Sequence, residues 1–334
     1  MSSLVKDARD QHRTSAPFWL AMQMGGLAAT VALLVGLGAW PKPTLTVLWN
    51  VVVPILPATF LIAPALWRNV CPLATANTLL NGRVSRRPLP ESLRKAAGFA
   101  GILLLLVLVP ARRFLFNGNG AVLAIVIVVV AVAALALGSV FDVKAGFCNA
   151  ICPVLPVERL YGQRPLADIG NPRCGECTQC SPRGCIDLAP TKSIAQTLGP
   201  SRRSNAWLRT PYGAFAAAFP GFVIGYYTLA DGPLTTALPV YLHVAAWMAG
   251  SWIAVALGVT VVRVHADRMI ALIGAAALAL YYWFAAPVIA AAIHAGDAGA
   301  LIIRILAAAL IAFWLAKAFV LPASNGIGMD LERP

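Results

Sequence analysis

The residues of this chain best suited to chemistry are its seven cysteines. Four of them, Cys174, Cys177, Cys180 and Cys185, follow the spacing C-x2-C-x2-C-x4-C. Three thiolates at short, equal gaps make a tight loop whose sulfur atoms and backbone N–H groups can all point at one bound group. This arrangement suits a cubane [4Fe–4S] cluster. Zinc more often takes two separated pairs of cysteines, so this run favours iron and sulfide.

The fourth ligand of this cluster stays open in the sequence. In bacterial ferredoxins the run is C-x2-C-x2-C-x3-C-P, and its last cysteine ligates the other cluster. Here the last gap is four residues long, and Ile186 follows Cys185 where a proline would stand. The fourth ligand is therefore either Cys185 or a thiol from one of the remote Cys-Pro pairs, Cys71-Pro72 and Cys152-Pro153.

The other three cysteines, Cys71, Cys148 and Cys152, stand where apolar runs give way to polar loops. Two all-cysteine cubanes need one more ligand than the seven cysteines supply. The three thiols therefore serve either a second cluster with a non-cysteine ligand or an open iron, or a separate role such as binding Cu(I), which soft thiolates favour. For Cys71 the alternative is a small residue packed at a helix end.

A weak internal repeat groups these segments. The stretches NVCPLATANTLLNGR (69–83) and AICPVLPVERLYGQR (150–164) each contain Cys-Pro, then a leucine, then a glycine about ten residues on. Trp67 stands in the first copy where Cys148 stands in the second. The repeat predicts two related helical hairpins, each ending in a cysteine hook on the same face of the membrane.

The composition predicts a membrane protein. The chain of 334 residues is 59% hydrophobic and 12% charged, with a mean hydropathy of +0.76, whereas soluble domains are about 25% charged. Apolar runs long enough to cross a bilayer cover residues 18–40, 45–67, 96–111, 120–141, 211–230, 238–263, 269–293 and 299–321. Lipid offers no hydrogen-bond partners, so these runs must be helices. The predicted fold class is an all-α integral membrane protein with about eight transmembrane helices and a cytoplasmic ferredoxin-like iron–sulfur loop.

The third run is the shortest because Arg112 and Arg113 interrupt it. We expect both side chains to reach toward an interface while the helix continues through Phe116.

The apolar runs divide the chain into five parts. An N-terminal segment (1–17) is followed by a first membrane half (18–141), an iron–sulfur segment (142–209), a second membrane half (210–322) and a C-terminal tail (323–334). The N-terminal segment lacks the pattern of a cleaved signal peptide. The net charge is +13, and alternating spans leave few basic residues on the side opposite the N-terminus: Lys42, Arg112, Arg113 and Arg304. This bias predicts that both polar loops and both termini are cytoplasmic in a bacterial inner membrane, where clustered cysteines are metal ligands more often than disulfides.

The motif FCNAICP at the end of a span, followed by the cysteine run, resembles the membrane-bound polyferredoxin family over about residues 45–190. That family includes the quinol-oxidising subunits of periplasmic nitrate reductase systems, the membrane ferredoxin of methylamine utilisation, the nitrous oxide reductase regulator and the accessory ferredoxin of cytochrome oxidase assembly. Members usually carry two full cysteine runs, whereas this chain has one, and its first hook lacks the leading cysteine.

The resemblance implies a membrane-integral [4Fe–4S] electron-transfer protein. Its partners would be the quinone pool or a cytoplasmic donor on one side and a redox protein or membrane complex on the other. The alternative is an accessory factor that assembles copper or another cofactor into a membrane redox enzyme.

Other residues carry weaker signals. His243 and His265 lie near opposite ends of one predicted span, about 33 Å apart, so they cannot hold one haem, and we expect no haem. Five aromatic residues are expected to form an interfacial belt rather than a quinone pocket: Tyr226, Tyr227, Tyr281, Tyr282 and Trp283.

A solvated face is expected for Glu158, Arg159 and Arg164. The charge comes without a basic helix or stacking platform, which argues against nucleic-acid binding.

Overall fold

The computed structural model describes residues 3–80, 84–85, 87–142, 144–167, 169, 186–187, 190–261 and 265–320, without the side chains of residues 3–16, 191 and 320. The predicted cysteine run, Cys174 to Cys185, and the tail 323–334 lie outside the described residues. Within the described part the chain is helical, and its β-type pairing is one isolated bridge between Arg87 and Phe141.

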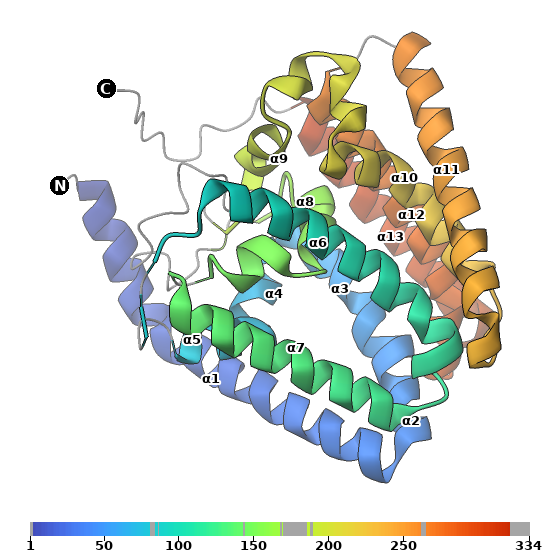
Figure 1. Cartoon of the computed structure of the whole chain (residues 1–334), viewed down its shortest axis with the longest axis horizontal. Coiled ribbons are helices and arrows are strands. Elements are labelled where there is room, and N and C mark those ends of the chain that lie inside the picture. The colour runs from blue at the N-terminus through green and yellow to red at the C-terminus, as the bar shows by residue number, and fades with distance from the viewer. Residues whose placement is uncertain are drawn as a thin grey trace.

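The α-helices of the described part are α1 (Ser3–Ala39), α2 (Pro41–Val47), α3 (Val53–Ile62), α4 (Pro64–Val70), α5 (Pro72–Leu79), α6 (Glu91–Ala111), α7 (Gly120–Val140), α8 (Leu155–Tyr161), α9 (Pro190–Leu198), α10 (Pro211–Tyr227), α11 (Ala237–Val261), α12 (Ala266–Ala292) and α13 (Gly296–Val320). Wider π-helical turns occupy Leu48–Val52, Arg112–Phe116 and Phe147–Ile151. Tighter 3-10 turns occupy Gly199–Arg203, Asn205–Arg209 and Leu234–Thr236. In Figure 1, α1 and α7 run side by side along one edge, and α11 forms the opposite edge beside α10.

Seven helical segments of the described residues are long and apolar enough to cross a membrane: Pro17–Ala39, Pro41–Ile62, Glu91–Phe116, Gly120–Val140, Leu234–Val261, Ala266–Ala292 and Gly296–Phe319. The prediction of a multi-pass helical membrane protein is thus confirmed. Large apolar side chains on α11 and α13, such as Leu257 and Leu306, are exposed as lipid-facing positions are. The third segment continues through Phe116, as expected.

The expected span 211–230 differs from the others. It forms α10, which has 17 residues and rises about 26 Å, short of the ~30 Å hydrocarbon core. Most of its residues are buried against neighbouring helices rather than facing lipid. Its end still meets the end of α6, because Arg112 Nη1 donates to the Tyr226 hydroxyl at 2.5 Å.

The expected span 45–67 is broken. Ala63 is extended (φ −162°, ψ 113°) between α3 and α4, because a residue that precedes a proline, here Pro64, is disfavoured in the helical conformation. The break frees the carbonyl oxygens of Leu61 and Ile62. They accept hydrogen bonds from the backbone N–H groups of Leu166 at 3.2 Å and Ala167 at 2.8 Å.

The two cysteine hooks lie inside the bundle, not in outer loops. Gln23 of α1 donates to the Asn69 carbonyl at 3.1 Å. Gly101 of α6 faces the second hook so closely that an added Cβ would lie 3.1 Å from the Cys152 carbonyl oxygen. Irregular backbone at this depth is tolerated where protein buries it. Cys71 and Cys152 lie between membrane-crossing segments, as the sequence predicted, and both hooks pack against neighbouring helices.

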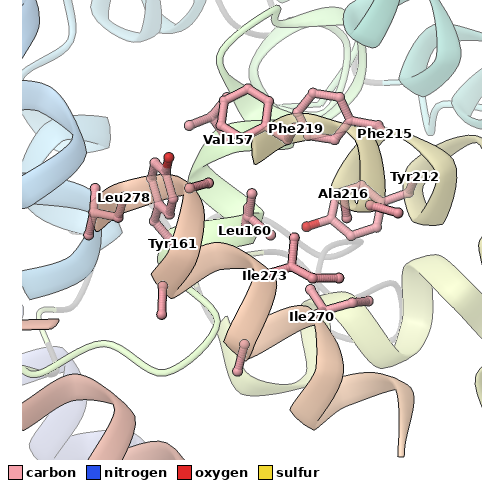
Figure 2. Packing of buried hydrophobic residues seen from close by; sticks show 14 of the residues in the cluster. Val157, Leu160, Tyr161, Tyr212, Phe215, Ala216, Phe219, Ile270, Ile273 and Leu278 are labelled. Atoms are coloured by element: carbon pink, nitrogen blue, oxygen red, sulfur yellow. The ribbon is translucent and has the colours of Figure 1, made fainter. Parts of the chain in front are cut away.

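The main hydrophobic core surrounds α8, which contacts α3, α6 and α12. Figure 2 shows Leu160 and Tyr161 of α8 beside Leu278 of α12, with Phe215 and Phe219 of α10 on the other side. The rings of Tyr161 and Phe219 meet edge to face, 6.3 Å apart. The core thereby fixes α8, which directly follows the second hook.

The first hook is held against α7 by a close backbone approach. Asn77 of α5 is fully buried and donates its Nδ2 to the Ala134 carbonyl at 2.8 Å. A Cβ on Gly138 would lie 1.8 Å from the Asn77 carbonyl oxygen. Position 138 therefore has no room for any side chain.

We expect Gly138→Ala to lower the free energy of unfolding by about 1–3 kcal/mol or more, because an added methyl forces α5 and α7 apart. Gly250→Ala in α11 is the matched control, since nothing lies within 4 Å of that Cβ position. Thermal unfolding of both purified variants in detergent measures the difference. Equal melting temperatures for the two variants would contradict the close approach.

Candidate functional site

Three of the predicted ligand cysteines come together in what we call the cysteine pocket: Cys71, Cys148 and Cys152. Cys71 links α4 to α5. Cys148 lies within the turn Phe147–Ile151, and Cys152 directly follows that turn. All three thiols are free, and they share one apolar cluster with Ala74, Ala134 and Phe147. Cys148 is buried, while Cys71 and Cys152 are partly buried. The structure thus gathers thiols that lie about 80 residues apart in the chain.

The two hooks have the same backbone shape at their Cys-Pro steps. Cys71 and Cys152 both adopt φ −55° and ψ 124°. The N–H of Cys71 bonds to the Trp67 carbonyl at 2.7 Å, and the N–H of Cys152 bonds to the Phe147 carbonyl at 3.1 Å. The second hook therefore spans one more residue, as a π-helical turn. This likeness supports the internal repeat predicted from the sequence.

A buried arginine joins the two hooks. Arg68 is 3% exposed and its guanidinium group makes three short contacts. Nε lies 2.6 Å from Asp187 Oδ1, Nη1 lies 2.5 Å from Glu158 Oε2, and Nη2 donates to Asn149 Oδ1 at 2.6 Å. Arg68 precedes Cys71 by three residues, and Asn149 precedes Cys152 by three. Equivalent positions of the two repeats therefore bond to each other.

A second buried cation completes this ion network. Lys144 Nζ donates to the Arg68 carbonyl at 2.9 Å and lies 3.7 Å from Asp187 Oδ2. The network thus balances Arg68 and Lys144 against Glu158 and Asp187. Balanced charge is what allows four ionised groups to stay out of water.

The ion network also holds the chain directly after the predicted cysteine run. Asp187 comes two residues after Cys185, and both Ile186 and Asp187 are buried. Two basic side chains, Arg68 and Lys144, therefore fix the exit of the run against the hook that carries Cys71. Asp187 and the first hook are therefore held by the same buried charges.

Burial governs the protonation of the pocket. It raises the pKa of the Cys148 thiol to about 12, although Arg68 and Lys144 oppose the shift. Burial likewise raises the pKa of Cys71 and of Cys152. These sulfurs are therefore protonated thiols at neutral pH, and their use as thiolate ligands requires the positive charge of a metal.

The two carboxylates respond differently to the same cations. Burial favours the neutral form of Asp187, but Arg68 and Lys144 outweigh it and lower the pKa of this carboxyl to about 2. Burial raises the pKa of Glu158, although Arg68 opposes the rise. Asp187 is therefore the firmly ionised partner of Arg68.

The pocket as it stands is not a finished metal centre. Within the described residues, no three His, Cys, Asp or Glu side chains converge closely enough to hold one ion. The donor set of the cysteine pocket is soft sulfur, which suits iron–sulfur clusters or Cu(I). Cys174, Cys177, Cys180 and Cys185 lie outside the described residues, so their part in the site stays a prediction.

Two expectations about polar residues were wrong. Glu158, expected on a solvated face, is 2% exposed and bound to Arg68, while Arg159 and Arg164 are partly exposed. The expected aromatic belt is also only partial. Tyr226 and Tyr282 are buried, and Tyr282 donates its hydroxyl to the Pro54 carbonyl at 3.0 Å.

The remaining predicted residues lie apart from the pocket. Trp283 is 58% exposed, as a belt residue should be. His243 Nε2 shares a hydrogen bond with Thr228 Oγ1 at 2.9 Å, and His265 begins the next helix, α12.

The sequence reading missed the residues that organise the site: Arg68, Lys144, Asn149 and Asp187. In the sequence, Arg68 and Lys144 show only as part of the positive charge of the polar segments. The repeat could have indicated the Arg68–Asn149 contact, because these residues occupy equivalent positions when Cys71 is aligned with Cys152.

No protein-family model, curated protein or solved structure matches this chain.

Replacing Arg68 should destabilise the protein strongly. We expect Arg68→Met to lower the free energy of unfolding by about 3–5 kcal/mol, because Glu158 and Asp187 would remain buried without a counter-ion. It should also open Cys148 to labelling by a thiol reagent. Arg94→Met is the control, since Arg94 pairs with Glu91 at the surface, where such pairs contribute about 0.2–1 kcal/mol. Similar losses in both variants would contradict a structural hub at Arg68.

Proposed function

We propose that this chain is a membrane-integral electron carrier whose cysteine run holds a [4Fe–4S] cluster. In this proposal Cys174, Cys177 and Cys180 are ligands, and Cys185 or a thiol of the cysteine pocket is the fourth. When bound, such a cluster supplies reversible transfer of single electrons. The described part of the chain anchors Asp187, which directly follows the run, to Arg68 and Lys144.

The observation that carries this proposal is the ion network at the exit of the run. Asp187 is bound by Arg68 and Lys144, and these same two cations lie close enough to Cys148 to act on its thiol. Carboxylates, cations and thiols within one buried region fix a ligand loop more firmly than a solvated loop would. Rigid ligands suit an electron carrier because they change position little between the oxidised and reduced states, so the reorganisation energy of electron transfer is small.

The depth of the hooks supports exchange with a lipid-soluble partner. Cys152 packs against Gly101, which lies within the membrane-crossing segment Glu91–Phe116. A quinone in the bilayer could come closer to the hooks than it could to a cluster held on an outer loop. The proposal places the hooks on the cytoplasmic side of a bacterial inner membrane, following the charge bias, with a redox protein or membrane complex as the second partner.

Anaerobically purified protein should show an EPR signal of a reduced cluster after addition of a quinol. Cys177→Ser should lose the signal, and Gln179→Ala, inside the same run but without a sulfur ligand, should keep it. If dithionite reduces the cluster and quinol adds no electrons, the quinone pool is not the partner. If Cys177→Ser keeps the full signal, the run is not the cluster site.

The free thiols of the cysteine pocket favour a second candidate function. Three unpaired sulfurs in an apolar pocket, Cys71, Cys148 and Cys152, resemble the soft donor set that Cu(I) prefers. The chain would then hand copper to a membrane redox enzyme during its assembly. The thiols would have to move closer together around the ion, since they do not converge as placed.

Copper titration distinguishes this role. Under reducing conditions, Cys71→Ser, Cys148→Ser and Cys152→Ser should each lower the number of Cu(I) ions bound per chain, while Cys177→Ser should lower the iron content instead. An unchanged copper stoichiometry in all three pocket variants would reject copper binding there.

A further inference from the structure

A second polar cluster lies away from the cysteine pocket, and we call it the arginine cluster: Trp49, Arg112, Arg113 and Tyr226. Arg112 lies eleven residues beyond Gly101, the residue of the same helical segment that contacts the second hook. That separation is about 16 Å along the helix axis. The cluster joins the segment Pro41–Ile62, the end of Glu91–Phe116 and the end of α10.

Aromatic rings hold both guanidinium groups. Arg112 Cζ lies 4.8 Å from the centroid of the Trp49 ring and 5.9 Å from that of Tyr226. Arg113 Cζ lies 4.4 Å from the Tyr226 centroid. Both guanidinium groups therefore pack against aromatic rings near the end of the segment Glu91–Phe116.

The cluster carries more positive than negative charge. Arg113 Nη1 pairs with Asp231 Oδ1 at 2.9 Å, and Asp231 is half exposed. Arg112 has no carboxylate partner among the described residues; its hydrogen bonds go to Asn117 Oδ1 at 3.0 Å and to the Tyr226 hydroxyl. A charge within a membrane-crossing segment is costly when its counter-ion is missing, and such positions are commonly functional.

Several hydrogen-bond donors of the cluster have no acceptor. Trp49 Nε1 and Arg113 Nε are buried and without a partner in the described part of the chain. Arg112 uses only Nε and Nη1 of a group that carries five N–H donors. Buried donors in proteins are nearly always paired. The cluster therefore calls for a ligand with several acceptor oxygens and a negative charge.

We propose that the arginine cluster binds the phosphate group of an anionic phospholipid. Phosphate oxygens accept paired hydrogen bonds from arginine, and the charge of the lipid would neutralise Arg112. The cluster lies near the end of the membrane-crossing segment Glu91–Phe116, where headgroups lie. Val47 and Val52, on either side of Trp49 in the chain, are exposed apolar residues available to acyl chains. These apolar neighbours favour a lipid over free phosphate.

Native mass spectrometry of the intact protein in detergent tests this site, using phosphatidylglycerol and phosphatidylcholine as probes. We expect wild-type protein to retain phosphatidylglycerol preferentially. Arg112→Gln should weaken retention about tenfold, as the loss of a charged hydrogen bond does. Trp49→Phe keeps the ring but removes the unpaired N–H, and should weaken retention several-fold with the fold intact.

The matched control is Arg304→Gln. Arg304 also stacks on a tryptophan, with its Cζ 4.2 Å from the Trp283 centroid, and it is partly buried, but it donates to the Trp283 carbonyl. Its loss should leave retention unchanged. Displacement of the lipid by inorganic phosphate alone would overturn the assignment to lipid in favour of a free anion. Equal retention in wild type, Arg112→Gln and Trp49→Phe, or a quinone retained in place of the phospholipid, would overturn the site.

Discussion

The structure depends on one buried guanidinium group. Burying a charge costs several kcal/mol unless partners are supplied in good geometry, so Arg68 can stay inside the bundle only with Asp187 and Glu158 beside it. Those partners come from segments 119 and 90 residues away. A single side chain therefore requires the first hook, α8 and the exit of the cysteine run to meet. The three thiols of the cysteine pocket pack in one apolar cluster beside this meeting point.

Prolines make the meeting possible inside a membrane. Each hook breaks its helix at a Cys-Pro step, and Pro64 breaks the helix about two turns before the first hook. Backbone groups freed at such breaks must find partners because lipid offers none. Leu166 and Ala167 supply N–H groups to the break at Ala63, and Lys317 of α13 donates to the Pro165 carbonyl at 2.7 Å. The last helix thus helps to hold the segment that follows the second hook, a role that its apolar sequence did not indicate.

Hydrophobic run length predicted most of the membrane helices because burial in lipid is a local property of about twenty residues. It failed where tertiary contacts decide. Run length alone did not reveal that α10 ends at Tyr227 and packs inside the protein. Glu158 looked solvated because it stands beside Arg159 in a charged stretch, and its partner Arg68 lies in the other hook. The spacing of Cys174, Cys177, Cys180 and Cys185 predicts an iron–sulfur site, which lies outside the described residues. The aligned repeat predicted that the hooks are related. Neither pattern could show that the hooks fold inward, since that follows from the long-range ion network.

The two polar clusters differ in their balance of charge. Thiols and balanced charges gather around Arg68, whereas uncompensated positive charge and unpaired donors gather around Arg112. The first arrangement suits a rigid redox or metal centre, and the second suits an anchor for an anionic lipid. α6 connects them, since Gly101 contacts the second hook and Arg112 lies near the far end of the same membrane-crossing segment.

The central claim, that the cysteine run holds an iron–sulfur cluster, is tested most directly by metal and sulfide analysis of anaerobically purified protein. The account predicts about four irons and about four acid-labile sulfides per chain. About eight irons and eight sulfides would mean that the chain holds a second cluster, in which the cysteine pocket takes part. Zinc without sulfide would contradict it.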